Sequence, residues 1–344
     1  MTDEHTIRRN VCAFAGAHGF GNVRPDDLEL LALGGSDRRF YRLRSGGRTC
    51  VAMVSQPPGE EHNSWLGINR FLSTCSIRVP AIYACDSDSH MLLIEDAGDE
   101  SMYSSLQAAA DRHAMLELYK QALQFLAEMQ HRATPRMRSC ACLSGRRFDY
   151  AAFRYETDYF VRSFLEEYCG MEKPAGLDHE FHRLAEALAA EPSVFMHRDF
   201  QSQNLHIADG RLMVIDFQTA TAGPPHYDLV SLLKDAYFVL TPEERLLLLQ
   251  HYFEARRAIG CPVEDTDAFS RIFHLCGLQR NMQALAAFSF LGTHKKKTQF
   301  FAHIPAALRY LHEALEHINA YPCLRAAVTA VCDEAARQRP RHLL

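Results

Sequence analysis

Long apolar runs are missing from this chain. The first twenty residues, MTDEHTIRRNVCAFAGAHGF, lack the extended apolar segment of a signal peptide. No later stretch approaches the ~20 consecutive apolar residues that a membrane-spanning helix needs. We therefore expect a cytoplasmic protein that has no membrane partner.

An excess of positive charge is also missing. Lys and Arg number 37 against 42 Asp and Glu, which gives a formal net charge of −5. Such a surface offers no general attraction for nucleic acid, so we expect no nucleic-acid partner. The eleven cysteines are odd in number and scattered, and the C-x-C pair Cys140 and Cys142 is no zinc signature by itself. Reduced thiols are the expected state.

What the chain does contain is enough apolar material for a sizeable core. It has 344 residues, of which 47% are hydrophobic and 23% are charged, so its length accommodates two domains or two lobes. It shows no internal repeat and no low-complexity tract. We therefore expect an ordinary globular protein.

Strand signals come first and helix signals follow. Apolar or alternating segments bounded by turn residues predict strands at Leu28–Leu33, RFYRLR (39–44), TCVAMV (49–54), AIYAC (81–85) and HMLLIED (90–96). A helix is predicted among them, with Glu61, Trp65, Ile68 and Leu72 on its inward face. Amphipathic helices begin at Met115–Gln130 and recur to the C-terminus. This order predicts an α+β, bilobal fold with a small β-sheet N-lobe containing one helix and a larger, mostly helical C-lobe.

Three polar residues stand out in the stretch FMHRDFQSQNLHIADGRLMVIDFQTA (195–220). Asp209-Gly210 is a hairpin-turn signal between two apolar runs. With that turn as the loop, Asn204 and Asp216 lie side by side at the open end of the hairpin, and Asp199 is five positions before Asn204. Hard oxygen ligands that converge at a cleft suit Mg²⁺, which takes further ligands from substrate oxygens. We expect phosphoryl transfer here, with a nearby carboxylate accepting the proton of the nucleophile.

The spacing of these residues is specific. His197-Arg198-Asp199, followed after four residues by Asn204, reproduces the H-R-D-x-x-x-x-N catalytic loop of kinases. Asp216 begins Asp-Phe-Gln where kinases carry D-F-G. A bare triplet arises by chance, but the triplet, the asparagine, the turn and the strand-terminal aspartate occur together. The pattern therefore favours a functional loop over a coincidental acidic hairpin.

From about Leu28 to about Leu315 the chain resembles the aminoglycoside phosphotransferase/choline kinase-like family, which has the protein-kinase-like fold. Within that family, the stretches MHRDFQSQNL, VIDFQTATAGPPHYDLVSLLKDAY and LQRNMQALAAFSFLG resemble bacterial amino-sugar kinases. Those kinases phosphorylate the anomeric hydroxyl of N-acetylmuramate and N-acetylglucosamine during cell-wall recycling. The resemblance implies ATP as the donor, Asp199 as the base, and Asn204 with Asp216 as magnesium ligands.

The resemblance also assigns supporting roles around the loop. Asp228, in PPHYDLVSLL, resembles the family's buried aspartate that braces the catalytic loop. His197 is better explained as a packed, hydrogen-bonded support than as a second base, because Asp199 already holds that role. Arg198 departs from the pattern, since many aminoglycoside-modifying members carry glycine there. This departure weakens the interpretation as a drug-resistance enzyme.

A turn rich in glycine is the candidate for contact with the nucleotide phosphates. Gly34, Gly35 and Ser36 follow the first strand candidate, and glycines let backbone N–H groups approach phosphate. An ordinary hairpin turn uses the same residues. Only its position before a kinase-type catalytic loop favours the phosphate-binding interpretation.

The third strand raises a difficulty for this interpretation. It carries Met53 where family members usually place a Lys or Arg that grips the phosphates and pairs with a helix glutamate. Glu61 is the candidate for that glutamate, and a buried glutamate without a cation would be costly. We therefore expect Arg38, Arg39 or Arg42 to supply the missing positive charge.

The lobe boundary is the expected adenine site. We divide the chain into residues 1–97, a nucleotide-binding lobe, and 98–344, a helical lobe with the catalytic loop and acceptor site. The backbone of Glu95, Asp96 and Ala97 can read the adenine edge while Ala52 and Ile215 cover the ring, so the side chains at 95–97 are expected to be replaceable. A solvated linker fits the same composition.

The acceptor side is the least defined part of the sequence. Candidates for contact with the acceptor are Gln201, Glu156 and Arg280 with its neighbour Asn281. Each of them could equally be a packing or helix-surface residue. Acceptor identity therefore rests on the family resemblance.

The function that we expect is an ATP-dependent small-molecule kinase, acting most plausibly on an amino sugar, as a monomer or weak dimer. One alternative is a phosphotransferase for an aminoglycoside, a choline-like alcohol or another metabolite. A third possibility is a catalytically silent nucleotide-binding module, and Met53 is the best support for it. A protein kinase is disfavoured, because A-P-E is missing and little chain separates Phe217 from Asp228.

Overall fold

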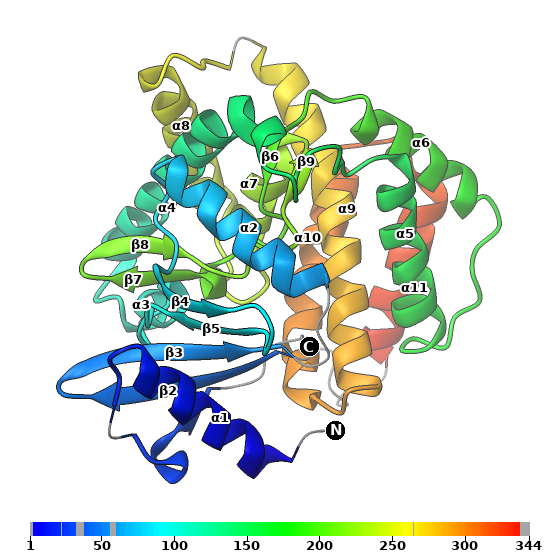
Figure 1. Cartoon of the computed structure of the whole chain (residues 1–344). Helices are drawn as coiled ribbons and strands as arrows, with labels where there is room; N and C mark the ends of the chain where they lie inside the picture. The colour runs from blue at the N-terminus through cyan, green and yellow to red at the C-terminus, as the bar shows by residue number, and fades with distance from the viewer. Residues whose placement is uncertain (1–2, 22, 32–37, 56–59, 264, 338–344) are drawn as a thin grey trace. The chain divides into compact units, whose positions relative to one another are not determined.

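The computed structural model describes residues 3–21, 23–31, 38–55, 60–263 and 265–337. The chain divides into two compact units (Figure 1). The first unit comprises Met1–Glu100 and His206–Thr219, and the second comprises Ser101–Leu205 and Ala220–Leu344. Residues 206–219 therefore group with the N-terminal hundred residues and not with the helices that flank them in the sequence. The division into residues 1–97 and 98–344 concerns function, and it stays a prediction.

A five-stranded antiparallel sheet forms the centre of the first unit, in the order β1-β2-β3-β5-β4. Its strands are β1 (Glu29–Leu30), β2 (Arg39–Ser45), β3 (Arg48–Val54), β4 (Ile82–Asp86) and β5 (Met91–Ile94). All five segments that the sequence predicts as strands are confirmed. The first is shorter than predicted, and residues 32–33 at its expected end lie outside the described residues.

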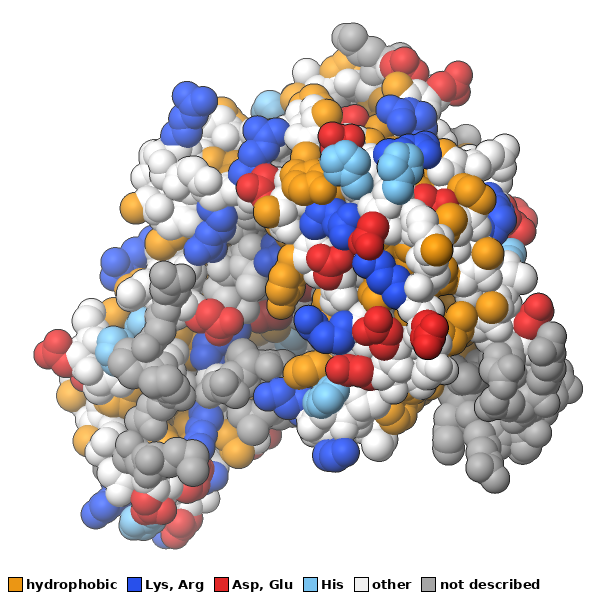
Figure 2. All heavy atoms as spheres, turned by 90° about the vertical axis from the view of Figure 1, so that its right-hand side faces the viewer, with side chains coloured by type: hydrophobic (Ala, Val, Ile, Leu, Met, Phe, Trp, Pro, Cys, Tyr) orange, Lys and Arg blue, Asp and Glu red, His pale blue; other side chains and the backbone are white. Residues whose placement is uncertain are grey.

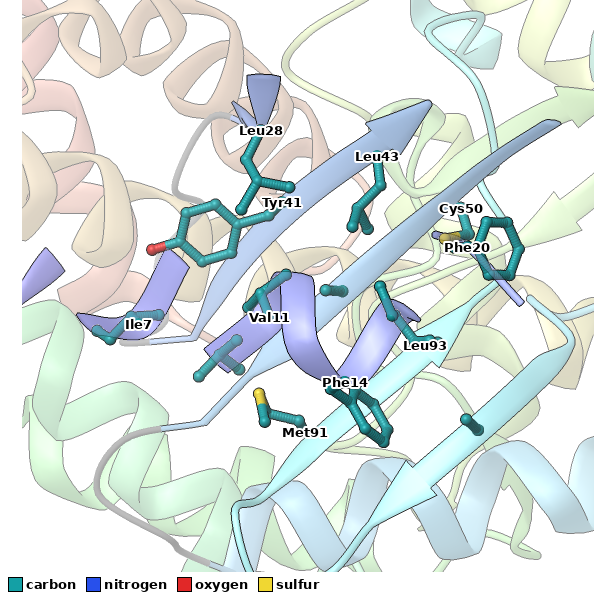
Figure 3. Close-up of a cluster of buried hydrophobic side chains, with 14 residues drawn as sticks. Ile7, Val11, Phe14, Phe20, Leu28, Tyr41, Leu43, Cys50, Met91 and Leu93 are labelled. Atoms are coloured by element: carbon teal, nitrogen blue, oxygen red, sulfur yellow. The ribbon is translucent and has the colours of Figure 1, made fainter. Parts of the chain in front are cut away.

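One face of this sheet is covered by α1 (Glu4–Ala17), a helix that the sequence analysis does not include. Ile7, Val11 and Phe14 recur at helical spacing and pack with Tyr41 and Leu43 of the sheet in one buried cluster (Figure 3). The described residues of the first unit thus form two α-helices, α1 and α2 (Glu60–Thr74), where one is predicted. Burial of the apolar stripe of α1 against the sheet stabilises both elements.

Ala52 belongs to the same buried cluster. It pairs directly with Tyr41 across β2 and β3, and it is fully buried. Successive side chains of a strand alternate between faces, so Val51 and Met53 point to the other side of the sheet. The expectation that Ala52 covers an adenine ring is therefore wrong, and Val51 is the strand residue that shares a face with Met53.

Helix α2 (Glu60–Thr74) carries its predicted buried face. Trp65, Ile68 and Leu72 are buried. Glu61 is not, because its side chain is 59% exposed. Spacing predicts the direction of a side chain on a helix, but it does not predict whether packing covers the first turn. The inward position predicted for Glu61 is corrected accordingly.

A β-hairpin forms where the sequence predicts it. Strands β7 (Leu205–Ala208) and β8 (Arg211–Val214) pair in a two-stranded sheet. Asp209 and Gly210 have φ values of 51° and 68°, the left-handed backbone that a two-residue type I′ turn requires at both positions. The Val214 N–H donates to the Arg78 carbonyl at 3.0 Å, which ties the hairpin to the rest of the first unit.

The second unit is mainly helical. Its helices are α3 (Met102–Ala108), α4 (Arg112–Ala133), α5 (Tyr150–Phe160), α6 (Leu177–Ala189), α7 (Pro225–Leu233), α8 (Pro242–Ala258), α9 (Thr266–Thr293), α10 (Ile304–Glu316) and α11 (Pro322–Arg337). Strands β6 (Val194–Met196) and β9 (Thr221–Gly223) pair beside them. Helix α9 packs against α5, α7 and α10 (Figure 1) and is apolar on most sides, as a central helix must be.

Three general expectations can be compared with the structure. Among the described residues, no helix has the length and apolar character of a membrane span. All eleven cysteines lie in the described part of the chain and are free thiols, as predicted. On the face drawn in Figure 2, basic and acidic side chains are interspersed.

Candidate active site

Asp199 lies in a loop that follows β6 and ends in the short 3-10 helix η4 (Ser202–Asn204). Its side chain is 36% exposed, so a ligand can reach the carboxylate. Oδ1 lies 3.5 Å from Nη2 of Arg280, which comes from α9 of the same unit. The loop thus presents a reachable carboxylate beside a guanidinium.

Asp228, on α7, anchors the beginning of this loop. Its Oδ2 accepts the N–H of His197 at 2.7 Å, and its Oδ1 accepts the N–H of Arg198 at 2.9 Å. The side chain is fully buried, and burial raises the pKa of Asp228 to about 7, although the two N–H groups act in the opposite direction. His197 is itself fully buried, with its ring edge-on to Phe200. Two consecutive N–H groups on one carboxylate hold the backbone that leads into Asp199.

Asp235 anchors the other end of the loop, and the sequence analysis assigned it no role. Its Oδ2 accepts both the N–H and the Oγ–H of Ser202, at 2.9 and 2.6 Å, and its Oδ1 accepts the N–H of Tyr237 at 3.0 Å. Asp235 is 3% exposed, and burial raises its pKa. The one available signal was an aspartate next to the apolar end of α7. That signal does not distinguish a buried anchor from a surface acid.

Arg198 adopts the left-handed backbone, with φ at 80°. Glycine takes this conformation without strain, whereas a residue with a Cβ atom is strained by about 1–2 kcal/mol. On backbone strain alone, glycine would therefore suit this position better than arginine. The arginine is held by its side chain instead: the guanidinium lies 4.9 Å from the ring centroid of Phe148, and Nη2 donates to Oε1 of Glu156 at 3.4 Å.

Glu156 is therefore a support of the loop, and it is not placed to contact an acceptor. It is 3% exposed, and it also accepts the hydroxyl of Tyr227 at 2.9 Å and Nε2 of Gln279 at 3.1 Å. Burial raises its pKa despite the neighbouring Arg198. The predicted contact with acceptor is corrected: the acid is enclosed because its partners come from distant positions that no local pattern reveals.

Gln201 and Arg280, the other acceptor-side candidates, lie together. Nη2 of Arg280 donates to Oε1 of Gln201 at 3.1 Å. Arg280 is 8% exposed, whereas Gln201 is only partly buried. The neighbouring Asn281 is buried and donates to the Gly277 carbonyl within α9 at 2.8 Å, so it serves its own helix.

The two predicted magnesium ligands have suitable chemistry, each within its own unit. In the second unit, Nδ2 of Asn204 donates to the Asp199 carbonyl at 2.9 Å, which leaves the amide Oδ1 as the group that a cation can bind. In the first unit, Asp216 follows β8 with φ at 62° and a carboxylate that is 45% exposed. Amide and carboxylate oxygens are ligands that Mg²⁺ prefers, and a small number of them leaves room for phosphate oxygens. The donor set fits the expected ion.

Arg38, directly before β2, is the arginine of the three candidates that contacts Asp216. Its Nη2 lies 3.2 Å from Oδ1 of Asp216, and its Nε lies 3.7 Å from Oε2 of Glu61. The arginine is 6% exposed, so the buried member of this ion pair is the cation and not the glutamate. Phe217 packs on Trp65 of α2, with ring centroids 5.3 Å apart. Together these contacts join α2 to the segment that follows the hairpin.

Arg42 and the segment after β5 have structural contacts that the sequence analysis did not foresee. Arg42 donates to both carboxylate oxygens of Asp96, at 2.7 and 2.9 Å, and to Asp99 at 2.8 Å. The Glu95 carboxylate binds Arg78, with one contact at 2.9 Å, and the Glu95 N–H donates to the Ala81 carbonyl. The side chains of Glu95 and Asp96 are therefore committed to ion pairs, and the expectation that they are replaceable is corrected.

Ala97, another predicted nucleotide contact, lies beside the hairpin. The backbone of Ala97 and Gly98 forms hydrogen bonds with the ring of His206, and burial of that ring lowers the pKa of His206 despite these hydrogen bonds. Gly34, Gly35 and Ser36 lie outside the described residues. Arg39 pairs with Glu4 of α1 and not with the segment around Asp216.

Comparisons with known proteins agree with this architecture. The sequence profile described as "Phosphotransferase enzyme family" matches residues 27–260. An N-acetylmuramate/N-acetylglucosamine kinase of Pseudomonas aeruginosa is 29% identical over 306 residues, which cover 87% of each chain. Another protein of that name, from Neisseria meningitidis, is 30% identical over 294 residues, 84% of this chain and 85% of the other.

The fold is confirmed by a solved structure. A choline/ethanolamine kinase family protein from Mesorhizobium loti superimposes with a TM-score of 0.60 at 14% identity, over 94% of this chain and 98% of that one. The expected protein-kinase-like fold and the expected resemblance are therefore both confirmed. On the profile match and on relatives aligned over most of its length, the chain belongs to the phosphotransferase enzyme family.

Proposed function

We propose that this protein is an ATP-dependent kinase that transfers the γ-phosphate to the anomeric hydroxyl of an amino sugar, N-acetylmuramate or N-acetylglucosamine. The names of relatives aligned over 84–87% of the chain support this acceptor class. The kinase-type loop from His197 to Asn204 supports the reaction type.

The observation that carries the proposal is the contrast between Asp199 and the acids around it. The carboxylates of Asp228, Asp235 and Glu156 are buried and accept hydrogen bonds from the protein, whereas that of Asp199 is 36% exposed. Asp199 is thus the member of this group that can meet a substrate hydroxyl. In the proposed reaction it accepts the hydroxyl proton as the oxygen attacks the phosphorus atom.

Asn204 and Asp216 are the proposed metal ligands, through the amide oxygen and a carboxylate oxygen. When bound, Mg²⁺ neutralises charge on the phosphates and on the transferring group. Asp228 and Asp235 hold the loop backbone at its two ends. Between them, the hydrogen bond from the Asn204 amide to the Asp199 carbonyl fixes the separation of Asp199 and Asn204.

Arg38 is the residue that we propose in place of the missing strand cation. It is buried and already contacts both Asp216 and Glu61, so a phosphate close to Asp216 would lie within reach of its guanidinium. Arg42 is unsuited to this role because Asp96 and Asp99 occupy it. Residues 1–97 remain the proposed nucleotide-binding lobe and 98–344 the proposed catalytic and acceptor lobe, with the backbone of 95–97 reading the adenine.

A screen of phosphoryl acceptors tests the proposal. ATP consumption is measured with Mg²⁺ over neutral sugars, N-acetylated amino sugars, aminoglycosides and amino alcohols, and phosphorus NMR locates the phosphate on any product. An anomeric phosphate on an N-acetylated amino sugar is the expected result. Turnover confined to aminoglycosides or amino alcohols would refute the proposed acceptor. A protein that binds the nucleotide but turns over none of these acceptors would refute the proposed activity.

A further inference from the structure

Arg280 uses its guanidinium to orient four different groups of the second unit. Nη2 donates to Oε1 of Gln201 at 3.1 Å and lies 3.5 Å from Oδ1 of Asp199. Nη1 donates to Oε1 of Gln283 at 2.6 Å, and Nε donates to Oγ of Ser231 at 2.9 Å. The side chain is 10% exposed. These contacts connect α9, α7 and the catalytic loop through one buried cation.

The contacts determine how the two glutamines are oriented. A guanidinium carries donors and no acceptor, so each amide must turn its oxygen toward Arg280. The NH₂ group of Gln201 and that of Gln283 then form the other end of each amide. Both glutamines are only partly buried, so these NH₂ groups are the ends that a ligand can meet. Arg280 thus converts two amides, which could accept or donate, into donors.

The exposed charges near Asp199 have a similar character. Arg198 is a second guanidinium, 31% exposed. The acids that support the loop, Glu156, Asp228 and Asp235, are at most 3% exposed, and burial raises the pKa of each. Apart from Asp199 and the amide oxygen of Asn204, which is the proposed metal ligand, the accessible charged and amide groups described around the loop are therefore donors or cations.

We propose that Arg280 is a positioning residue that makes the acceptor site donor-rich, and so selects uncharged or anionic acceptors bearing carbonyl and hydroxyl oxygens over acceptors that carry an ammonium group. This inference rests on the proposed function, because it takes Asp199 as the group beside which the acceptor binds. It adds the residue that discriminates by charge among acceptors of one ring type.

The physical reason is the mismatch between donors. An ammonium group has only donors, so it finds no partner among two amide NH₂ groups and a guanidinium. Of the acceptors described around the loop, the Asn204 amide oxygen is the proposed metal ligand. An ammonium group is therefore left with the Asp199 carboxylate, and an ion pair there would occupy the base. An N-acetyl carbonyl or a hydroxyl oxygen accepts from the glutamines and leaves Asp199 available for the reacting hydroxyl.

Three sugars of one ring type differ in charge: N-acetylglucosamine is neutral, N-acetylmuramate is anionic, and glucosamine carries an ammonium group. The variants are Arg280→Gln, Arg280→Lys and Gln283→Glu. Arg271→Gln is the matched control, since Arg271 is an exposed arginine on the same helix. For each protein, kcat and KM are measured for every sugar, together with the Kd of Mg-ATP. Acceptor binding without nucleotide is followed by saturation-transfer NMR.

The wild-type protein is expected to prefer N-acetylglucosamine over glucosamine by about 100-fold in kcat/KM, and Arg280→Gln is expected to reduce this preference to below about 10-fold, because charge-assisted contacts of this kind are worth one to two factors of ten. In Arg280→Gln, the KM for N-acetylglucosamine should rise while the Kd of Mg-ATP stays constant. Arg280→Lys keeps the charge but cannot bridge both amides. Its preference for N-acetylglucosamine should therefore lie between that of the wild type and that of Arg280→Gln. Arg271→Gln should match the wild type.

Gln283→Glu keeps Arg280 and replaces a donor by a carboxylate, so it tests the idea even if Arg280 variants unfold. It is expected to improve glucosamine relative to N-acetylglucosamine by about 10-fold in NMR-detected binding and in kcat/KM. An active wild type whose preference survives in folded Arg280→Gln, or in Gln283→Glu, overturns this inference and leaves the proposed function standing. A wild type that phosphorylates none of these sugars overturns both.

Discussion

The proposed catalytic loop (197–204) and the segment that follows the hairpin (216–218) each present an aspartate a few residues after a strand, yet they are held in opposite ways. Buried carboxylates grip the loop backbone at both ends, through His197 and Arg198 at one end and Ser202 at the other. Asp216 instead accepts hydrogen bonds through its own carboxylate, from Arg38 at 3.2 Å and from Gln218 at 2.9 Å.

The difference separates two ways of preparing a reactive group. Anchoring the backbone leaves the Asp199 side chain accessible and fixes where it starts, which reduces the reorganisation needed during a reaction. Anchoring the side chain, as at Asp216, stabilises the segment but engages one carboxylate oxygen, Oδ1, which accepts both hydrogen bonds. A ligand that uses Oδ1 of Asp216 must therefore compete with Arg38, whereas a ligand at Asp199 meets a prepared loop.

The largest effect is expected from Asp199→Asn. The change removes the proposed base and preserves the shape of the loop, so kcat should fall by about 1000-fold while the Kd of Mg-ATP changes by less than about 2-fold. Asp158→Asn, at an acid of the same unit that is 56% exposed, is the control. Steady-state kinetics and calorimetry measure the two quantities, and unchanged turnover would remove Asp199 from the role of base.

Asp216→Asn is expected to weaken magnesium-dependent nucleotide binding by about 100-fold, because a carboxylate ligand becomes an amide. Asp209→Asn makes the same chemical change at another residue with left-handed backbone, in the turn of the hairpin that precedes Asp216, and it should have no effect on binding. Calorimetric titration with and without Mg²⁺ distinguishes the two variants. Equal affinities would show that Asp216 is not a metal ligand.

Asp228 predicts a pH dependence of stability. Burial raises the pKa of Asp228 to about 7, above its ordinary value of 3.8, so the folded protein binds a proton that the unfolded chain releases. The stability that this bound proton contributes is fully present below about pH 4, and it is lost as the pH rises from there through about 7. Asp228→Asn cannot ionise, so its free energy of unfolding relative to the wild type should rise by about 3 kcal/mol between pH 5 and pH 8. Urea unfolding at both pH values checks this, and parallel pH profiles would contradict it.

The smallest expected change in nucleotide binding distinguishes the three candidate arginines, Arg38, Arg39 and Arg42. Arg38→Ala should raise the Kd of Mg-ATP by about 10-fold, the loss of one charged contact. Arg39→Ala should leave the Kd within about 2-fold, because Arg39 pairs with Glu4 on α1. Arg42→Ala should chiefly lower the free energy of unfolding, by about 3 kcal/mol, because it leaves the buried Asp96 unpaired. If none of the three changes the Kd, another group must contact the phosphates.

The parts of the fold that the sequence predicts correctly depend on local signals. Asp209-Gly210 places left-handed backbone at a turn, and the alternation of RFYRLR and the apolar run TCVAMV predict strands, so neither signal needs a distant partner. Helix α1 was missed because its apolar residues, Ile7, Val11 and Phe14, are diluted by charged neighbours. They become a recognisable stripe only against the sheet.

The candidate site divides in the same way. The loop motif singles out Asp199 and Asn204 because their spacing is local. Asp235 and Glu156 could not be recognised as buried anchors, since Asp235 meets Ser202 33 positions away and Glu156 meets Tyr227 71 positions away. Burial is a property of the packed chain, and a carboxylate in a sequence carries no sign of it.

The left-handed arginine at position 198 has a consequence for how this chain could have diverged. A long side chain on strained backbone needs both a stacking surface and a counter-charge, which Phe148 and Glu156 supply here. Among related sequences, an aromatic ring at 148 and an acid at 156 should therefore covary with arginine at 198, whereas glycine at 198 would remove this one requirement from each position.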